Sequence, residues 1–452
     1  MKAGVVYAKA FSANGWRVDS SFHLSDSNVL YSLLDSCPYK QTTIDGIKKD
    51  CFFGNIFTRV FVKDAEHGVP YMTASDMVKA EPLSGRFLSK KQVASLSNLI
   101  LRKDWILISC SGTIGNVVYT NEQFDGVVAT HDLIRLLPDD SKLKGGVLYA
   151  YLASRYGYIM LTQSRFGGVV KHINPSHVSQ IPIPLFPDDF QTKIDKQIKE
   201  SAALRVEANK LLEEAKKKVE EFVGFVFESK KTDVVSSQRI LQSFGHRLEA
   251  NFHISAGSAL EDYIKDKFDY KLLGDVCKTI SRPDIFKRNY VKDGVMFLGG
   301  ADIMLATPDS GKYLSRKTPN IEALVVEEDW ILIPRSGTIG DVVYTHSEHA
   351  QKLVSEDVIR ACPNDILSSG YIYAFLASKI GKALIQRYIF GSVIQHVESP
   401  HLSRIPIPLM PEKEMAAIDS SIKKYKVNMG QAIRLEQSAI KAVEQEIDSW
   451  SK

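Results

Sequence analysis

Two long stretches of the chain place apolar residues at every third or fourth position, with lysines and glutamates between them. This spacing predicts two helices of about 35–40 residues, or roughly 55 Å, each with one narrow apolar seam. A narrow seam needs a partner, so we expect the helices to pair with each other; the alternative is that each packs only on its own domain. The seam residues are Ile194, Ile198, Leu204 and Leu211 after Pro187, and Ile418, Ile422, Met429, Ile440 and Ile447 after Pro411.

Single residues refine the expected course of these helices. Asp188 stands where an N-cap is expected, and Gln191 follows three residues later, which is the spacing of a capping box. Gly430 lies near the middle of the second stretch. We expect it to weaken that helix locally, because glycine is a poor helix former.

The part of the chain before each long helix is one copy of a repeat. Residues 104–120 (DWILISCSGTIGNVVYT) and 329–345 (DWILIPRSGTIGDVVYT) are identical at fourteen of seventeen positions. The offset between copies falls from 230 to 224 along the chain, so insertions lie between the matching blocks, as surface loops do. Two domains therefore share one fold. Other matching blocks are RVDSSFH and RLEANFH (17–23, 247–253), IFTRVFVKD and IFKRNYVKD (56–64, 285–293), DLIR and DVIR (132–135, 357–360), and FGGVVKHINPSHVSQIPIPLFP and FGSVIQHVESPHLSRIPIPLMP (166–187, 390–411).

Local patterns predict the elements of each copy. The β-branched and aromatic runs WILI and VVYT flank a Ser-Gly-Thr-Ile-Gly segment, which predicts strand, tight turn and strand. Helical spacing follows at 146–163 and 370–386. The prolines of IPIP exclude the middle of a sheet and favour an extended connector that leaves the domain. The predicted fold is α/β of the mixed α+β kind: globular domains at 1–187 and 232–411, a long helix with a linker at 188–231, and a C-terminal long helix at 412–452.

Composition limits the class of protein. The 452 residues are 44% hydrophobic and 24% charged, with no apolar run long enough to cross a membrane and no signal-peptide pattern at the start. Five scattered cysteines without a CxxC pair indicate reduced thiols, so we expect a cytoplasmic protein without a zinc site. The net charge of +4 means that any nucleic-acid contact must come from local basic faces.

The doubled order of these motifs resembles the specificity subunit of type I restriction–modification systems. The resemblance rests on the Arg-[Val/Leu]-acid-x-x-Phe opening, the SGTIG turn and the I-P-I-P-L-x-P ending before a long helix, and it covers nearly the whole chain. One feature departs from the family pattern. A Glu-Gln pair often follows the prolines, whereas here one tail keeps only Gln191 and the other only Glu414.

The resemblance implies a non-catalytic DNA-recognition subunit. Each domain would be a target recognition domain that reads one half of a bipartite sequence in double-stranded DNA. The long helices would pair antiparallel and set the distance between the halves. The subunit would dock two adenine methyltransferase subunits and, through them, restriction subunits. S-adenosylmethionine, ATP and Mg would then be bound by those partners, and no cofactor by this chain.

Two other functions are compatible with a repeat of this kind. A DNA methyltransferase or nuclease with fused catalysis is the first, but NPSH (174–177) departs from the methyltransferase Asn-Pro-Pro-aromatic loop and its copy is ESPH. The SGTIG segment lacks the Gly-Lys-Ser/Thr ending of a phosphate-binding loop. The histidine pairs His172/His177 and His396/His401 suit packing better than metal binding. The second alternative is a repeat adaptor that binds protein.

Positions that differ between matching blocks are the candidates for reading different half-sites. Cys110 is replaced by Arg335 in the second copy, and Lys171 by Gln395. Arginine and glutamine are suited to bidentate contacts with guanine and adenine edges. Basic clusters in more divergent stretches are candidates for phosphate contacts, although each also fits a solvated surface charge. These are Lys90, Lys91, Arg102, Lys103, Arg316 and Lys317.

Overall fold

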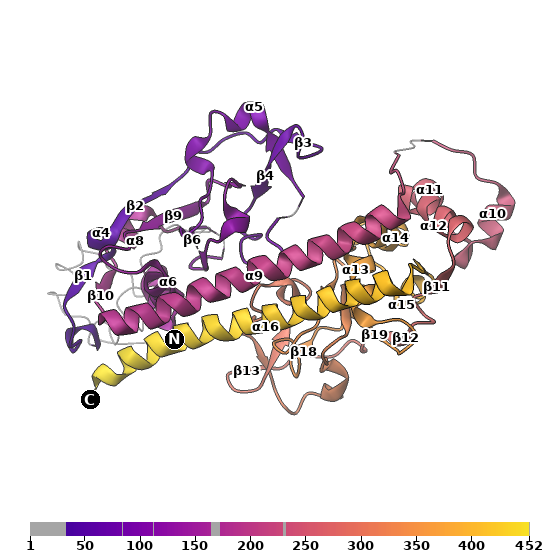
Figure 1. The fold of residues 1–452 in the computed structure, drawn as a ribbon. Helices are drawn as coiled ribbons and strands as arrows, with labels where there is room; N and C mark the ends of the chain where they lie inside the picture. Colours follow the sequence, from indigo (N-terminus) through magenta and orange to yellow (C-terminus); the bar gives the residue numbers. More distant parts are fainter. Residues whose placement is uncertain (1–32, 84, 112, 164–171, 229–231, 452) are drawn as a thin grey trace. The chain divides into compact units, whose positions relative to one another are not determined.

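The computed structural model of the chain describes residues 33–451 apart from 84, 112, 164–171 and 229–231. The chain forms two compact units (Figure 1): unit 1 contains Met1–Val206 and Gln431–Lys452, and unit 2 contains Glu207–Gly430. The first copy of the opening motif (17–23) and Lys171 lie outside the described residues. The predicted domains end where the long helices begin, whereas each compact unit also includes half of each long helix.

Unit 1 is built around a four-stranded antiparallel sheet with the order β2-β9-β6-β7. Its strands are β2 (Lys48–Phe53), β9 (Leu133–Pro138), β6 (Ile106–Ser109) and β7 (Val117–Tyr119). A second sheet has the order β3-β5-β4-β8 and one parallel pair, β4 with β8. Its strands are β3 (Phe61–Val62), β5 (Phe87–Ser89), β4 (Gly68–Met72) and β8 (Val128–Ala129). The short helix α5 (Lys90–Val93) follows β5.

Unit 2 repeats this topology element by element. Its first sheet has the order β12-β19-β16-β17, and its second has the order β13-β15-β14-β18 with β14 and β18 parallel. The strands are β12 (Cys277–Ser281), β19 (Val358–Pro363), β16 (Ile331–Pro334), β17 (Val343–Tyr344), β13 (Tyr290–Val291), β15 (Tyr313–Leu314), β14 (Val295–Leu298) and β18 (Leu353–Val354). Helices α10 (Ser237–Gln242), α11 (Ala250–Ile254) and α12 (Ala256–Lys267) precede them. The mixed α/β class and the repeated fold are thus confirmed.

Helices cover the first sheet of each unit. The helical stretch after β9 is two helices, α6 (Gly145–Ala153) and α7 (Arg155–Gln163), and the copy in unit 2 is α13 (Ser369–Ala377) and α14 (Lys379–Arg387). The break falls at Ser154, whose hydroxyl donates to Tyr151 O at 2.6 Å and accepts from Gly157 N at 3.2 Å. A Cβ at Gly157 would lie 2.3 Å from Tyr151 O, so the tight fold-back of α7 on α6 requires glycine there.

The IPIP segment is extended, as predicted, but it is also paired. In unit 1 it forms β10 (Pro182–Pro184), which pairs antiparallel with β1 (Gln41–Thr43). In unit 2 it forms β20 (Pro406–Pro408), which pairs with β11 (Tyr270–Leu272). These sheets have only two strands, so each proline needs no partner on its second side. The segment leads into the long helices α9 (Asp188–Val223) and α16 (Glu412–Asp448).

In unit 1 the first half of α9 lies beside the last half of α16, and the two run antiparallel (Figure 1). Gln197 Nε2 donates to Ser438 Oγ at 3.4 Å, and Ser201 Oγ donates to Ala432 O at 2.7 Å. In unit 2, Lys424 pairs with Glu207 at 2.5 Å. The helices therefore pair, as predicted. The same seam also packs on the globular core, because Ile194 and the α16 residues Ala439, Val443 and Ile447 belong to the core cluster of unit 1.

Most seam residues are placed as predicted. Ile194, Ile198, Ile418, Ile422, Met429 and Ile447 are buried. Leu204, Leu211 and Ile440 are only half-buried, which corrects the prediction. The buried stripe steps by three and four residues through Ala208, Leu212, Ala215, Val219 and Val223 in α9, and in α16 Ala439 takes the place of Ile440. One residue corresponds to a rotation of about 100° around a helix axis with 3.6 residues per turn. Leu211 and Ile440, each next in sequence to a buried seam residue, therefore lie at the side of the seam.

Two expectations about the helix course need correction. Asp188 is the first helical residue and not the cap: Gln191 N donates to Pro187 O at 2.9 Å. The Gln191 side chain reaches back instead, donating to Phe186 O at 2.7 Å and accepting from Lys144 N at 3.2 Å. The second helix is also continuous, because α16 passes through the buried Gly430 without a break.

Each long helix is fastened to its own domain by a buried aspartate. Asp195 accepts from Gly146 N at 2.9 Å at the start of α6, and Asp419 accepts from Gly370 N at 3.1 Å at the start of α13. A second carboxylate comes from the other long helix. Glu444 accepts from Arg155 N at 2.7 Å in unit 1, and Glu220 accepts from Lys379 N at 2.9 Å in unit 2. Carboxylates thus satisfy free N–H groups at helix N-termini in both units.

Two further properties of the described residues concern membranes and metals. No helix among them combines the length and apolar character needed to cross a membrane. Nor do three or more His, Cys, Asp or Glu side chains gather anywhere in this described part to form a metal site.

Candidate nucleic-acid interface

The SGTIG turn joins β6 to β7 in unit 1 and β16 to β17 in unit 2. Its last glycine has a positive φ in both copies, 90° at Gly115 and 105° at Gly340. A Cβ at Gly340 would lie 3.0 Å from Lys382 Cγ in α14, and one at Gly115 would lie 3.2 Å from Tyr158 in α7. Glycine is therefore needed for both the backbone conformation and the close approach of a helix. The turn, which is identical in the two copies, therefore shapes the backbone.

A hairpin from the FGSVIQH block lies directly beside this turn in unit 2. Phe390 and His396 exchange backbone hydrogen bonds of 3.0 and 2.8 Å, which closes the loop 391–395. The tip of the loop is fully accessible: Val393 is 94% exposed, and Gln395 is exposed. Residues Ser336 and His396 form a β-bridge, and Val397 N donates to Arg335 O at 3.0 Å.

Unit 1 brings the same two motifs together. Ser111 forms a β-bridge with His172, and Ile173 N donates to Cys110 O at 3.1 Å. Blocks about 60 residues apart in the sequence are therefore neighbours in both units, although no sequence pattern pointed to this contact. The predicted pair Arg335 and Gln395 belongs to one loop pair in unit 2.

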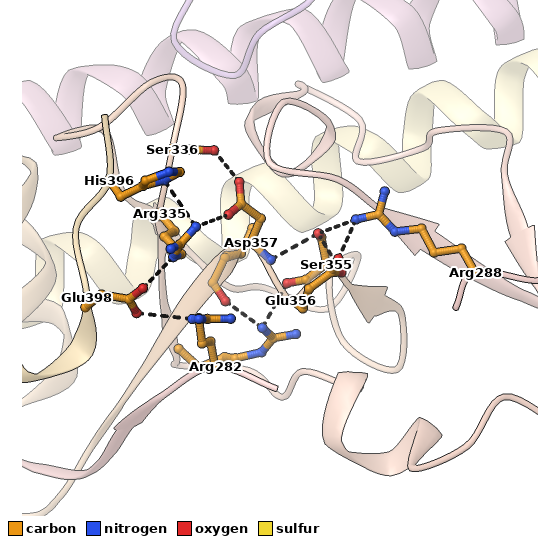
Figure 2. Close-up of polar contacts among 11 residues, drawn as sticks. Arg282, Arg288, Arg335, Ser336, Ser355, Glu356, Asp357, His396 and Glu398 are labelled. Carbon is orange, nitrogen blue, oxygen red and sulfur yellow. Dashed lines mark hydrogen bonds and ion pairs between the residues drawn. The ribbon is translucent and has the colours of Figure 1, made fainter. Parts of the chain in front are cut away.

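Arg335 sits at the centre of a polar network (Figure 2). Its Nε donates to Glu398 at 2.7 Å, and one terminal nitrogen donates to Asp357 at 3.2 Å and lies 3.1 Å from His396 Nδ1. Ser336 donates its hydroxyl to the other oxygen of Asp357. Arg335 therefore braces the turn against the hairpin. A bidentate contact between both terminal nitrogens of Arg335 and a base edge would require it to give up Asp357 or His396.

Glu398 joins a second arginine to this network. Arg282, which follows β12, donates to the Glu398 carboxylate at 3.1 Å (Figure 2). Burial raises the pKa of the Glu398 carboxyl, but hydrogen bonds from Arg335 and Arg282 outweigh that effect and hold the pKa below its usual value. The network therefore stays charged at neutral pH.

The counterpart of Arg335 in unit 1 cannot read DNA. Cys110 is only 6% exposed and belongs to the core cluster with Ile106 and Ile108. Burial raises the pKa of its thiol to about 11. The expectation that Cys110 contacts bases is therefore wrong, because its side chain faces the core. Both faces of β6 are buried, so its apolar run continues into Cys110 just after the strand.

A buried arginine supports the loop that carries the aspartate in each unit. Arg135 donates to Leu133 O at 2.7 Å and to Ala129 O at 3.1 Å. Arg360 donates to Ser355 O at 3.0 Å and to Val354 O at 2.6 Å. No carboxylate pairs with either guanidinium among the described residues, and burial lowers the pKa of each to about 10. The sequence analysis missed this role, although an arginine shared by two apolar strands was a signal.

The predicted phosphate contacts are accessible but dispersed. Lys90 and Lys91 are exposed at the start of α5, and Arg316 and Lys317 are exposed just after β15. Arg102 and Lys103 precede β6 and form exposed ion pairs with Asp125 at 3.5 Å and Glu122 at 3.7 Å. Exposed pairs of this kind contribute little, so both side chains remain available for a phosphate.

The NPSH segment is a helix cap. Asn174 accepts from His177 N at 3.0 Å and begins α8 (Pro175–Ser179). Among the histidines, His401 stacks on Tyr388 with ring centroids 5.9 Å apart, and burial lowers its pKa. The methyltransferase-like tetrapeptide therefore has a structural use here.

The opening motif is also structural in its described copy. Arg247 is nearly buried and donates to Tyr388 O at 3.1 Å and Ile389 O at 2.6 Å, beside the start of the hairpin. Glu249 accepts from the same guanidinium at 3.0 Å, and the arginine stacks on Phe252, 4.6 Å from its centroid. His253 Nε2 lies 2.6 Å from Arg247 O, within hydrogen-bond distance. The Arg-Leu-Glu-x-x-Phe-His spacing thus fixes the base of the hairpin.

Each unit has the same two four-stranded sheets and contains part of both long helices, so the chain is a tandem repeat of one domain. The family model described as "Type I restriction modification DNA specificity domain" matches residues 52–217 and 265–445. This is most of the chain, with one match in each half. The chain belongs to this family and is a specificity subunit that recognises a bipartite DNA sequence within a type I restriction–modification complex.

Three solved structures are similar to the chain. The type I restriction–modification S subunit from M. genitalium is 17% identical, with 90% of this chain and 96% of that chain covered and a TM-score of 0.35. The HsdS subunit from Thermoanaerobacter tengcongensis is 14% identical, with 92% and 97% covered and a TM-score of 0.29. A chain from a study of the assembly and conformational transition of the type I system is 13% identical, with 92% and 97% covered and a TM-score of 0.28. No curated protein sequence matches the chain significantly.

Proposed function

We propose that each unit reads its half-site with the loop pair formed by the SGTIG turn and the neighbouring FGxVxxH hairpin. The observation that carries this proposal is the contact of Ser336 with His396 in unit 2 and of Ser111 with His172 in unit 1. The turn is invariant and rigid, so it supports the hairpin. The hairpin loop is exposed in unit 2, and its sequence differs between the copies, as a reading element must.

Gln395 is the residue we assign to base reading in unit 2. It is exposed at the end of the loop 391–395, directly before His396, and no hydrogen bond joins it to Arg335 among the contacts described. A glutamine amide offers a donor and an acceptor that match the adenine edge in the major groove. Lys171 holds the matching sequence position in the first copy and would suit a guanine. Different residues at one position would then give the half-sites different sequences.

We further propose that two methyltransferase subunits, and restriction subunits through them, supply the chemistry. Two copies of one fold offer two equivalent docking surfaces, which supports a pair of identical partners. The chain alone would transfer no methyl group, since the segment most like a catalytic loop is used as a helix cap. S-adenosylmethionine, ATP and Mg would belong to those partners. The complex would act on DNA in the cytoplasm.

The assignment of Gln395 is tested in the complex with the methyltransferase. Wild type and Gln395→Ala are expressed in a host without other DNA methylation, and methylated sites are mapped by sequencing. We expect one base of one half-site to become degenerate, since a lost bidentate contact relaxes discrimination by about 1–3 kcal/mol. Gln242→Ala removes another exposed glutamine, at the end of α10, and should leave the target unchanged. An unaltered target in the Gln395 variant would refute the assignment.

A further inference from the structure

Two isoleucines occupy the same exposed position in the two units. Ile56 is 83% exposed and Ile285 is 82% exposed. Each lies in the segment that joins the first sheet of its unit to the second, between β2 and β3 in unit 1 and between β12 and β13 in unit 2. The second sheet is called the small sheet below, because its strands are mostly shorter. One exposed apolar side chain is ordinary in a protein surface. An exposed isoleucine at the same position in both copies, while other positions have diverged, indicates that the side chain has a function.

The next side chain along each segment is anchored. Phe57 packs against the core of the small sheet in unit 1. Phe286 does so in unit 2, with its ring centroid 6.3 Å from that of Phe297. Because the half-buried phenylalanine after the isoleucine faces the core, the isoleucine itself is directed outward.

The arginine two residues after the phenylalanine is anchored as well. Arg59 donates to Tyr71 Oη at 2.6 Å and to Thr130 Oγ1 at 3.3 Å. In unit 2, Arg288 donates to Ser355 Oγ at 3.3 Å and to Glu356 at 2.8 Å (Figure 2). Both arginines therefore reach the loop that follows β8 or β18. These contacts hold the segment in place on both sides of its exposed isoleucine.

The repeat distinguishes required apolar positions from incidental ones. Unit 1 has exposed apolar side chains at Phe53 and Val60 in the same segment. Their counterparts in unit 2 are Arg282 and Asn289, so an apolar residue is not needed there. The isoleucine is unchanged. A residue identical in both units cannot distinguish two different half-sites, so it must contact a feature that both halves have in common.

The charge around the isoleucines favours a polyanion. Residues 53–63 contain Arg59 and Lys63 and no acidic residue. Residues 282–292 contain four basic residues and the acidic Asp284; Arg282 and Arg288 pair with Glu398 and Glu356, so Lys287 and Lys292 are the cations left for a partner. Duplex DNA is the polyanion that fits the proposed function, on which this inference rests. Its backbone is charged, so an apolar side chain finds apolar surface only by entering a groove and meeting the bases.

We propose that Ile56 and Ile285 are apolar wedges, each of which enters a groove of the DNA and opens a base step beside its half-site. Side chains of this kind unstack a step without reading its sequence, which accounts for the same residue in both units. The exposed Lys63, Lys287 and Lys292 beside them hold the neighbouring phosphates. The wedges thereby add affinity and bend the duplex, while sequence reading stays with the hairpin.

The test uses the full chain with its methyltransferase partner and a fluorescein-labelled duplex of about 40 base pairs of mixed sequence, long enough for both half-sites. The variants are Ile56→Ala, Ile285→Ala and the double change. Ile366→Ala is the matched control, because it is the same substitution at a 58% exposed position just after β19. We expect each single change to weaken binding about tenfold, from the apolar surface no longer buried. The salt dependence of binding should stay unchanged, because no cation is lost.

A second readout reports the wedge itself. A duplex with donor and acceptor dyes at its ends should show less bending with the double variant than with wild type, at concentrations that saturate both. Unchanged affinity and unchanged bending would overturn the proposal. If DNA binding is unchanged and binding of the methyltransferase subunit falls instead, the isoleucines belong to a protein interface and the proposal is wrong. If wild type itself fails to bind DNA, the proposed function has failed before the wedge is at issue.

Discussion

Replacing Asp419 should loosen the attachment of α16 to its domain in unit 2. The Asp419 carboxylate accepts from Gly370 N at 3.1 Å, at the start of the buried helix α13. Asp419→Ala leaves this N–H without an acceptor, which costs about 1–3 kcal/mol for a buried group. Loss of the negative charge at the N-terminus of α13 adds about 0.3–1 kcal/mol. We therefore expect the free energy of unfolding of unit 2 to fall by about 2–3 kcal/mol.

Two related variants separate the hydrogen bond from the fit of the helix. Asp419→Asn keeps an oxygen acceptor and should lose less than half as much stability. Gly370→Ala keeps the aspartate, but its Cβ would lie 2.6 Å from Asp419 Oδ1 and 3.0 Å from Asp419 Cα. The α16 backbone would have to move, which costs about 1–3 kcal/mol in a packed site.

The assay is urea unfolding followed by fluorescence, with amide hydrogen exchange across residues 369–377. Ser420→Ala, the exposed neighbour on the same helix, is the control and should stay within about 0.5 kcal/mol of wild type. Protection at the start of α13 should fall in Asp419→Ala and persist in the control. An unfolding midpoint equal to wild type, with unchanged protection, would refute the idea that this hydrogen bond fastens the helix.

Further expectations follow from other contacts. Burial lowers the pKa of His349 from 6.5 to about 4, so on acidification the unfolded chain takes up the proton before the folded chain does. The free energy of unfolding should therefore fall by about 3 kcal/mol as the pH drops from 6.5 to 4, and His349→Gln should show a flatter pH dependence over that range. Arg360→Met should cost about 3 kcal/mol in urea unfolding, because several buried carbonyls lose their donor; a loss below 1 kcal/mol would contradict this. One heptad inserted in both α9 and α16 adds roughly 10 Å, or about three base pairs, and selection on duplexes with variable gaps should favour a longer gap than for wild type, whereas insertion in α9 alone should break the pairing. The double change Arg335→Cys with Glu398→Asn gives unit 2 the residues that unit 1 has at these positions, Cys110 and Asn174, and should keep the methylated target. Arg335→Cys alone leaves Glu398 with Arg282 as its one partner in the network and should lower the free energy of unfolding.

The sequence was sufficient for elements with strong local patterns. The β-branched runs around SGTIG gave the strand pair β16–β17, and the helical spacing gave α9 and α16, because side-chain periodicity depends only on local backbone geometry. The short strands of the small sheets were not predicted. The strand β13 has two residues, Tyr290–Val291, and exists because β15 pairs with it from more than twenty residues away.

The candidate site was predictable only in part, for a related reason. The hairpin and the turn are distant in sequence, and their contact arises from packing that no periodicity encodes. Likewise the aspartates of the long helices read as ordinary exposed acids, since their partners are backbone N–H groups supplied by another helix. The burial of Cys110 could not be predicted from its position alone, because Arg335 follows an equally apolar strand and is only half-buried.

Differences between the two copies therefore fall into two physical kinds. Arg335 in place of Cys110 coincides with Glu398 in place of Asn174, and the new arginine and glutamate bind each other at 2.7 Å. Such coupled changes compensate one another within the fold, so they carry no information about the DNA. Gln395 in place of Lys171 has no such compensating partner in the network around Arg335, and its side chain is exposed. An uncoupled difference at an exposed tip is what selection for a different half-site would leave, which is why we assign base reading to Gln395 and bracing to Arg335.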